Sequence, residues 1–569
     1  MVGGADDSSI SIYLTLVPRA HTWVRPYGVV RNCTPRHVHR TVAHIVLGGA
    51  SMRKSSIFRN ALLLTCSDLL LRLMGIGFNA FLAHRMGAGG LGLLQLISSV
   101  GFFALIVGSS GVRVAAMCLT AEEYGKGNPP GAYAAVRACL KYGLCISALT
   151  GGLLFLCSPV VAAALLGSPE AATPLRIIGV FLPCSCLCGV MTGYFTACGE
   201  VRRTVGVQIA ERLLSMAFTA LVLLSGMAKS SQAACCAVLL GSSLGSALEF
   251  SLLYLLFRKR TRSLRHKKRP KMGQRLRKLC LPLALNDYLR AGLNTAEQLL
   301  IPFGLAKFGA SAESALADHG TIHGMVFPIL MFPAAILFSL ADLLVPELAR
   351  SRAEGQGRRI ISLSDRCLRL TWLYACAVGG FLFCCARPLG QMIYGSGEAG
   401  AYLRIFAPMA LMLYLDAITD GMLKGLSQQL SCVRYNTLTS LMDVTLLFFL
   451  LPRWGIGGYI FSFALTHGVN LILSLRRLLQ VTHYRLPLRQ LGTGLICLLL
   501  CLGAAMLLPV QESPYAELTG RGGFFLCLLS GLYLLSNSLC TRDLRWFRGV
   551  LFPEKKPPEQ ERRLPIRRR

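Results

Sequence analysis

Apolar segments long enough to cross a lipid bilayer recur along almost the whole chain. A spanning helix needs about 20 mainly apolar residues, and by that standard we find about fourteen candidate spans. Only 15% of the 569 residues are charged, whereas a soluble protein carries roughly 25%. The chain is therefore predicted to be an all-α, polytopic membrane protein with no soluble enzyme domain. The candidate spans are centred near residues 57–83, 92–117, 136–157, 175–198, 205–227, 232–257, 279–305, 321–346, 367–387, 402–424, 431–451, 456–476, 491–509 and 522–540.

The basic residues are concentrated in the short connections between these spans. The net charge of +32 invites a comparison with nucleic-acid-binding proteins, but membrane proteins place Lys and Arg in cytoplasmic loops in this way. The most basic connection, 258–278, follows the sixth span, and the tail 541–569 is also basic, whereas loop 158–171 has no Lys or Arg. The pattern predicts a multi-pass protein of the cell membrane with both termini in the cytoplasm and no nucleic-acid partner.

The sequence contains none of the common catalytic motifs. A Walker A loop, an H-E-x-x-H motif and a G-x-S-x-G motif are all absent, and the loops are too short to hold a catalytic domain. Most of the 22 cysteines lie inside apolar runs, where a free cysteine behaves as a small hydrophobic residue. We therefore predict no enzyme, no cofactor and no metal centre.

The first fifty residues differ from the rest of the chain. They mix His, Arg, Thr and Pro without periodicity, and a short basic lead begins only at Met52. We predict that residues 1–51 are either a disordered extension or lie before the true start at Met52. N-terminal sequencing of the native protein tests this, and a mature chain beginning at Met1 would refute the second alternative.

A weak internal repeat divides the chain near its middle. In the first span Asp68 is followed one turn later by Arg72, and in the seventh span Asp287 is followed by Arg290. Both spans start from the cytoplasm, so the repeat predicts two parallel six-helix lobes, and transporters built from such halves bind substrate near the membrane midplane. The predicted parts are an N-lobe at 52–257, a cytoplasmic linker at 258–278, a C-lobe at 279–479, two further spans in 480–540 and the tail 541–569.

Several short stretches carry a family resemblance. They are residues 59–75 with Arg59-Asn60-Ala61-Leu62, residues 82–96 with Gly87-Ala88-Gly89-Gly90, residues 295–302 with Ile301-Pro302, and residues 320–347 with Phe332-Pro333 and Val345-Pro346-Glu347. These stretches resemble stage V sporulation protein B and related polysaccharide flippases. That family belongs to the multidrug/oligosaccharidyl-lipid/polysaccharide exporter superfamily, which also contains the lipid II flippases.

The resemblance implies two helical bundles around a central cavity, with the last two spans packed outside them. It also implies that a polyprenyl-diphosphate-linked saccharide, a cell-wall or polysaccharide precursor, is moved by alternating access. The chain departs from the lipid II branch at Phe78-Asn79, at 102–105 and at Phe303-Gly304, where that branch or the sporulation-type relatives have charged residues. These departures count against lipid II as the substrate.

Ionisable residues inside spans are costly and therefore indicate function. We predict that Arg72, Arg113 and Arg290 contact the anionic head of the substrate, because guanidinium groups bind phosphate through two parallel hydrogen bonds. The acids Asp68, Asp287 and Glu297 would balance charge or respond to a coupling cation, sodium or proton. The alternative is that each acid neutralises the arginine one turn away, which does not apply to Glu297 because it has no such neighbour.

Other polar residues in the spans favour structural roles. Asp416, Asp420 and Lys424 follow at intervals of four residues in the tenth span, which favours local ion pairing. Asp342 lies at the inner end of the eighth span, where a charge is readily solvated. His467 and Asn470 in the twelfth span are predicted to form hydrogen bonds between helices.

Three classes of function remain to be compared. The favoured one is a monomeric flippase whose partners are a lipid-linked saccharide, membrane lipid and a coupling cation. The alternative is a cation-coupled small-molecule or multidrug exporter of the same fold. A membrane glycosyltransferase is disfavoured by the short outer loops, which lack paired carboxylates.

Overall fold

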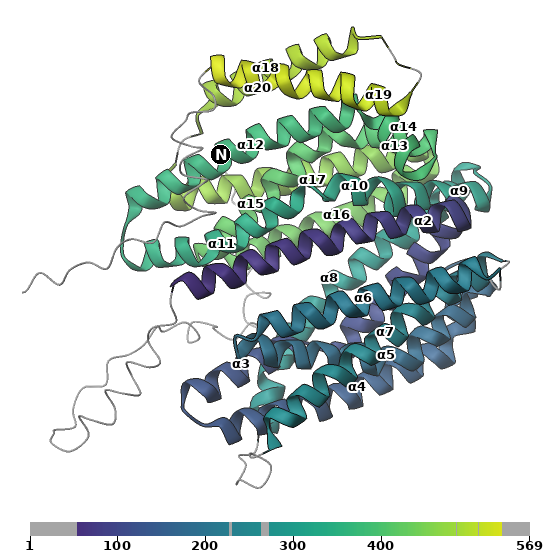
Figure 1. Cartoon of the computed structure of the whole chain (residues 1–569), viewed down its shortest axis with the longest axis vertical. Helices are drawn as coiled ribbons and strands as arrows, with labels where there is room; N and C mark the ends of the chain where they lie inside the picture. Colours follow the sequence, from purple (N-terminus) through teal and green to yellow (C-terminus); the bar gives the residue numbers. More distant parts are fainter. Residues whose placement is uncertain are drawn as a thin grey trace, which may run out of the picture. The chain divides into compact units, whose positions relative to one another are not determined.

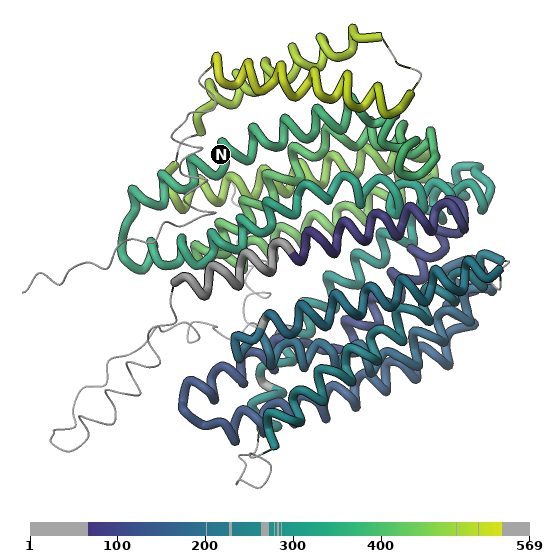
Figure 2. Tube along the Cα trace, viewed as in Figure 1, coloured from purple at the N-terminus to yellow at the C-terminus, as the bar shows by residue number. Residues whose placement is uncertain are grey.

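The computed structural model describes residues 54–226, 230–262, 272–484, 486–509, 511 and 513–536. Throughout these residues the chain is helical and contains no strand (Figures 1 and 2). The predicted all-α class is therefore confirmed. The predictions for residues 1–51, for 263–271 of the basic linker and for the tail 541–569 lie outside the described residues.

The helices before the basic linker pack together as one bundle, except that the first part of α2 lies against helices that follow the linker, where Asn79 donates a hydrogen bond to the carbonyl of Gly324. In this bundle α5 contacts α3, α4 and α7, and α7 also contacts α6. Its core includes Val112, Tyr133, Tyr194 and Phe257, all nearly inaccessible to solvent. The helices are α2 (Lys54–Ser109), α3 (Val112–Gly125), α4 (Pro129–Ala164), α5 (Ala172–Ala197), α6 (Val201–Leu224) and α7 (Ser231–Arg260).

The first of these helices is interrupted at a glycine. Gly87 has φ 71° and ψ 177°, which breaks the helical path inside α2, and only glycine adopts that conformation without strain. A second break separates α2 from α3, where Ser110 and Gly111 both have positive φ. The predicted first and second spans are thus joined in one kinked helix.

A second group of helices follows the linker. Here α16 contacts α8 and α17, and α15 contacts α11, α12 and α17. Its helices are α8 (Gly273–Phe308), α9 (Ala312–His319), the π-helical segment Gly320–Val326, α10 (Phe327–Met331), α11 (Ala334–Ala353), α12 (Gly357–Cys384), α13 (Ala386–Tyr394), α14 (Gly397–Phe406), α15 (Ala410–Gly425), α16 (Gln429–Trp454) and α17 (Ile456–Thr482).

Helix α8 packs against both groups. Near its start, Met272, Leu276 and Cys280 belong to the core of the first bundle. Further along, Ile301 and Leu305 belong to the main core of the chain, and α8 packs along α16. This one helix therefore couples the two groups mechanically.

The eighth predicted span is a bent pair of helices. Residues Ala312–Met331 and Ala334–Ala353 meet at 57°, and Pro333 lies at the bend, where its ring prevents a regular helix. Before the bend, α2 approaches α9 and the π-helical segment so closely that a Cβ on Gly92 would collide with the backbone of Leu316, and a Cβ on Gly320 with the backbone of Ala88 and Gly92. The two glycines thus allow two helices to touch at their backbones.

The last helices form a pair beside the second group. Helix α18 (Leu488–Met506) contacts α12 and α20 (Gly523–Leu535), as Figure 1 shows. Short segments of α19 (Pro514–Glu517) and a π-helical turn lead into α20. Cys501 and Phe525 are completely buried between these helices and α12.

The predicted count of about fourteen spans is not confirmed. Among the described residues, 11 helices are long and apolar enough to cross a membrane, or up to 12 if the bent pair is one span. Two differences account for most of the discrepancy. The predicted first two spans fall in one continuous stretch, Ser67–Gly125, and α8 is not among the candidates. Helix α8 carries Asp287, Arg290 and Glu297 in its interior, which lowers its hydropathy.

Candidate functional site

A polar cavity of about 660 Å³ opens among the helices of the second group. Its walls come from α8, the π-helical segment, α10, α11, α15, α16 and α17. Acidic side chains outnumber basic ones in the lining. The ionisable residues that line it are Glu297, Asp342, Asp416, Asp420, Asp443, Arg290, Lys424, His323 and His467. We call this the acidic cavity.

Two of the predicted site residues, Arg290 and Glu297 of α8, line the acidic cavity. Glu297 follows Arg290 by seven positions, about two helical turns, so both lie on one face of the helix. Arg290 is exposed and has no ion pair or hydrogen bond to any described side chain. An unpaired guanidinium at a cavity wall is available for an anionic ligand.

Arg72 lies beside the same cavity but comes from α2. Its Nε donates a hydrogen bond of 3.0 Å to Asp68, and its guanidinium carbon lies 5.5 Å from the centre of the Phe338 ring. Phe338 is itself part of the cavity wall. Because the bond to Asp68 uses only Nε, the two terminal nitrogens of Arg72 have no acceptor within the described part of the chain.

The other two predicted residues lie elsewhere. Arg113 is exposed on α3, where it interacts electrostatically with Glu249 of α7, and it does not line the acidic cavity. Asp287 is half-buried on α8 and makes no ion pair with Arg290 in the described residues. The roles proposed for Arg113 and Asp287 therefore stay predictions without support from the cavity.

A buried carboxylate that the sequence analysis missed lies opposite Glu297. Asp443 of α16 is 7% exposed, and Ser462 donates a hydrogen bond of 2.7 Å to its Oδ1. Thr466 places its hydroxyl 3.3 Å from the same oxygen, and Glu297 and Asp443 interact electrostatically. A charged residue in the middle of the apolar helix 429–454 was the available signal.

The acids of α15 make hydrogen bonds with amides instead of ion pairs. The Asn470 amide donates to Asp416 at 2.9 Å, and the Asn436 amide donates to Asp420 at 3.2 Å. Neither acid forms an ion pair with Lys424 among the described side chains, so the predicted local ion pairing is wrong. The amides of α16 and α17 reach both acids because three helices converge here. The predicted hydrogen bonding between helices is confirmed for Asn470.

Three oxygen atoms of this network have no donor within the described part of the chain. They are Oδ1 of Asp416, Oδ1 of Asp420 and Oδ1 of Asn470, all buried. Buried acceptors are normally satisfied, and an exception calls for a proton, a water molecule or a cation. His323 also faces the cavity, but its ring nitrogens lie 3.3 Å from Gln298 and 3.3 Å from Tyr459. Oxygen acceptors thus converge in the acidic cavity without enough donors.

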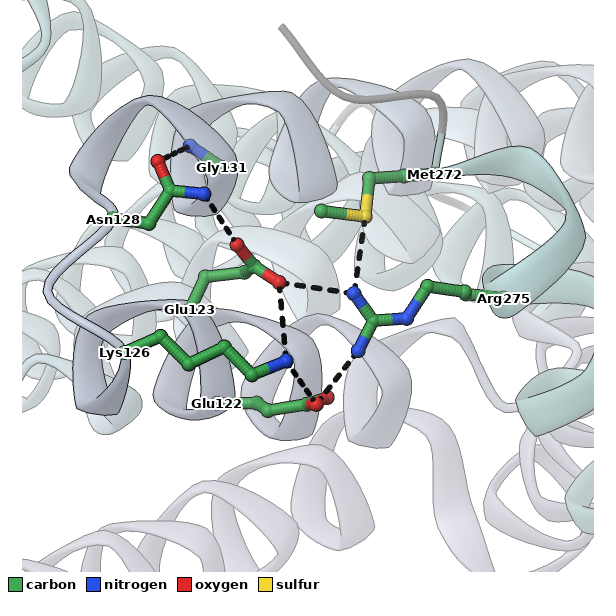
Figure 3. Close-up of polar contacts among 7 residues, drawn as sticks. All are labelled: Glu122, Glu123, Lys126, Asn128, Gly131, Met272 and Arg275. Atoms are coloured by element: carbon green, nitrogen blue, oxygen red, sulfur yellow. Dashed lines mark hydrogen bonds and ion pairs between the residues drawn. The ribbon is translucent and has the colours of Figure 1, made fainter. Parts of the chain in front are cut away.

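A separate ionic cluster ties the start of α8 to the first bundle (Figure 3). Arg275 of α8 contacts Glu122 at 2.6 Å and Glu123 at 3.0 Å, and Lys126 contacts Glu122 at 2.6 Å. Glu123 is 4% exposed, and Asn128 donates a hydrogen bond of 2.8 Å to it. We call Glu122, Glu123, Lys126 and Arg275 the α3–α8 clasp.

Replacing Arg275 with alanine is expected to lower the unfolding temperature of the purified protein by about 1–2 °C. The change leaves Glu123 buried without its main cation, at a cost of about 1–2 kcal/mol once the half-exposed position of Arg275 is considered. Differential scanning fluorimetry in detergent measures the shift. Arg350→Ala is the matched control, because its ion pair with Glu354 is exposed and lies within one helix turn. Equal shifts for both variants would refute a special role for the clasp.

The fold and the acidic cavity define a class of protein, a helical multi-pass membrane protein whose polar cavity lies within a bundle. Comparisons with known proteins agree with this class. The family model for polysaccharide biosynthesis proteins matches residues 57–301. Stage V sporulation protein B of Bacillus subtilis (strain 168) is 22% identical over 428 residues, which cover 74% of this chain and 83% of that protein. Sporulation protein YkvU of the same organism is 26% identical over 153 residues, which cover 26% of this chain and 34% of that protein.

Solved structures share the fold. The lipid II flippase MurJ in an inward closed conformation aligns with a TM-score of 0.64 and 13% identity, covering 85% of this chain and 100% of that one. An inward-facing multidrug resistance transporter of the MATE family aligns with a TM-score of 0.59 and 15% identity, and the alignment covers 73% of this chain and 96% of that one. The predicted resemblance is confirmed. The chain is a multi-pass helical membrane protein that shares the fold of these structures.

Proposed function

We propose that this chain moves a saccharide linked to polyprenyl diphosphate across the cell membrane by alternating access. The substrate would be a cell-wall or polysaccharide precursor, as the polysaccharide and sporulation relatives suggest. One observation carries the proposal, the placement of two arginines from different halves of the chain at one cavity. Arg290 lines the acidic cavity from α8, and Arg72 lies against its wall from α2.

The chemistry of these arginines fits a lipid diphosphate. A guanidinium binds phosphate oxygens through two parallel hydrogen bonds, and such charge-assisted bonds are about twice as strong as neutral ones. Arg72 keeps both terminal nitrogens available because Asp68 holds only Nε. That ion pair fixes the direction of the side chain while leaving its binding face open. A diphosphate bound between Arg72 and Arg290 would be held by both halves of the chain at once.

The acidic cavity supports coupling to a cation, which we propose is sodium or a proton. Five carboxylates against two cationic side chains repel a diphosphate until a cation reduces the negative charge. The pair Glu297 and Asp443 is the strongest candidate, because two carboxylates that interact electrostatically favour a bound cation or a shared proton. Cation binding would then favour substrate binding at Arg72 and Arg290, and the linkage would be reciprocal.

Depletion of the protein tests the substrate class. We expect a polyprenyl-diphosphate-linked saccharide to accumulate severalfold in the membrane when the protein is depleted, because its removal to the outer leaflet stops. Lipid extraction and mass spectrometry identify the accumulated lipid. Re-expression of the wild-type chain should restore the normal level, while a variant lacking Arg72 and Arg290 should not. Unchanged lipid-linked precursors after depletion would exclude this function.

A second candidate function is a cation-coupled exporter of small molecules. The acid-rich lining of the cavity favours it, since such a surface attracts organic cations, and the fold is shared with a multidrug resistance transporter. This candidate predicts altered tolerance to cationic compounds after depletion, with no accumulated precursor. It also predicts that alanine at Arg72 and Arg290 preserves export, because an organic cation has no use for those arginines.

A further inference from the structure

A second charged cavity lies in the first bundle, between the start of α4 and the end of α7. Its volume is about 490 Å³, and it shares no lining residue with the acidic cavity. Arg137 and Lys141 stand one turn apart on α4, and Arg258 faces them from α7. We call this cavity the basic pocket. The proposed function does not use it.

Aromatic rings give the basic pocket a rigid base. The buried rings of Tyr133 and Phe257 stack with centroids 5.7 Å apart and an interplanar angle of 15°. The guanidinium of Arg137 lies 6.0 Å above the Tyr133 ring, which directs the charge along the pocket wall. Tyr254, 37% exposed, completes the rim. Packed rings therefore hold at least one of the three cations in place.

No described acidic residue compensates the charges of the basic pocket. Its lining includes Arg137, Lys141 and Arg258 but no Asp or Glu, and none of the three forms an ion pair with another described side chain. Three like charges around one cavity repel each other, and an anion placed among them relieves that repulsion. Arginine and lysine together are the usual donors to phosphate groups.

The sequence around the basic pocket places it at the edge of the membrane. Helix α4 has 36 residues and is therefore about 54 Å long, well beyond a hydrocarbon core of about 30 Å. Lys141 is the last charged residue before residues 142–164, which carry no charge at all, and residues 250–257 before Arg258 are equally free of charge. Both helices thus leave the apolar region at the pocket.

Aliphatic surface lies directly beside the pocket on the membrane side. Leu144 of α4 is 48% exposed, and Leu252 and Leu255 of α7 are 38% and 57% exposed. On a spanning helix such side chains face acyl chains. A ligand that fits both surfaces has a phosphate head among the cations and hydrocarbon tails along the leucines. Basic pockets between spanning helices at the cytoplasmic side bind anionic lipid heads in this way.

We propose that the basic pocket binds the phosphate headgroup of an anionic phospholipid of the surrounding leaflet. The lipid would be a resident ligand and not the transported substrate. Because the pocket joins α4 to α7, a bound lipid would hold the two ends together and stabilise the folded protein in proportion to its concentration.

Thermal unfolding and native mass spectrometry of the purified full-length chain test the proposal. We expect phosphatidylglycerol added to detergent-solubilised protein to raise the unfolding temperature and to remain bound, whereas phosphatidylcholine should do neither. The triple variant Arg137→Gln, Lys141→Gln, Arg258→Gln should lose this response. Each removed cation should weaken binding by about fivefold, and all three by about 100-fold.

A control with the same loss of charge separates a specific site from general attraction. Arg202, Arg476 and Arg489 are exposed and lie outside both cavities, so their triple glutamine variant should respond to phosphatidylglycerol as the wild type does. An equal loss in both triple variants would overturn the proposal, as would an equal rise caused by inorganic phosphate without lipid. If the pocket triple variant fails to fold, Lys141→Gln alone should still bind phosphatidylglycerol about fivefold more weakly, and unchanged binding would contradict the assignment.

Discussion

Alanine at both Arg72 and Arg290 is expected to abolish transport while leaving the amount of protein in the membrane unchanged. A charge-assisted hydrogen bond contributes about 1.5–3 kcal/mol, so losing one arginine should slow transport by about 10- to 150-fold. The double variant should be slower than either single variant, since the two residues lie on different helices and each removes its own phosphate contact. Flipping of a fluorescent lipid-linked saccharide in proteoliposomes measures the rate directly.

Lysine variants and an alanine variant of an arginine outside the cavity show whether the loss of transport is specific to Arg72 and Arg290. Lysine at both positions keeps the charge but loses the planar fork, so we expect partial activity. Arg176→Ala is the control, because Arg176 donates a hydrogen bond of 3.1 Å to Ser158 of α4 and does not line the acidic cavity. Removing Asp68 together with Arg72 tests whether an unpaired acid causes the loss. Normal transport by the double alanine variant would remove both arginines from the mechanism.

Arg113 provides an independent comparison within the same assay. The sequence predicts the same role for it as for Arg72 and Arg290, yet the structure places it beside Glu249 and away from the acidic cavity. If the cavity determines where the headgroup binds, alanine at Arg113 should slow transport less than alanine at Arg290. An equal loss would locate part of the substrate path in the first bundle.

The fold class could be predicted because the bilayer imposes strong rules on sequence. Long apolar runs with basic connections require helices, since an unpaired backbone is too costly in lipid. The number of spans was harder to predict. The chain bends at Gly87 without leaving the helical stretch, so the first two predicted spans are joined. The charged residues of α8 lower the hydropathy of that helix. Both departures come from residues that serve the kink or the cavity, where local rules are expected to fail.

The candidate site could be predicted only in part, for a physical reason. Arg290 and Glu297 were identified because a charge inside an apolar helix is costly, and Asp443 has the same signal although it was missed. The partners of these groups could not be predicted. The regular spacing of Asp416, Asp420 and Lys424 suggests ion pairs along one helix, but amides from α16 and α17 approach the acids instead. Which neighbour reaches a polar group depends on how three helices converge, and one sequence does not contain that information.

Neutralising Glu297 and Asp443 is expected to uncouple transport from the cation gradient. Glu297→Gln and Asp443→Asn each preserve size and hydrogen bonding, and the amide oxygen that the second change introduces can still accept from Ser462. Each should reduce gradient-driven transport by at least about tenfold, the effect of losing one charged contact of about 1.4 kcal/mol. Transport into proteoliposomes with an imposed sodium or proton gradient measures the effect and identifies the ion.

The double variant distinguishes a shared site from two separate ones. If Glu297 and Asp443 hold one cation, the double variant should be no worse than the more damaged single variant, because residues acting on one ligand are not additive. Asp365→Asn is the control, since Asp365 also accepts a short hydrogen bond, 2.6 Å from Tyr484, but lies outside the acidic cavity.

Reciprocal linkage requires that the cation raise the affinity for the lipid diphosphate as much as the diphosphate raises the affinity for the cation. Both effects should vanish together in Asp443→Asn, and a variant that loses only one of them would show that the acids and the arginines belong to unconnected sites.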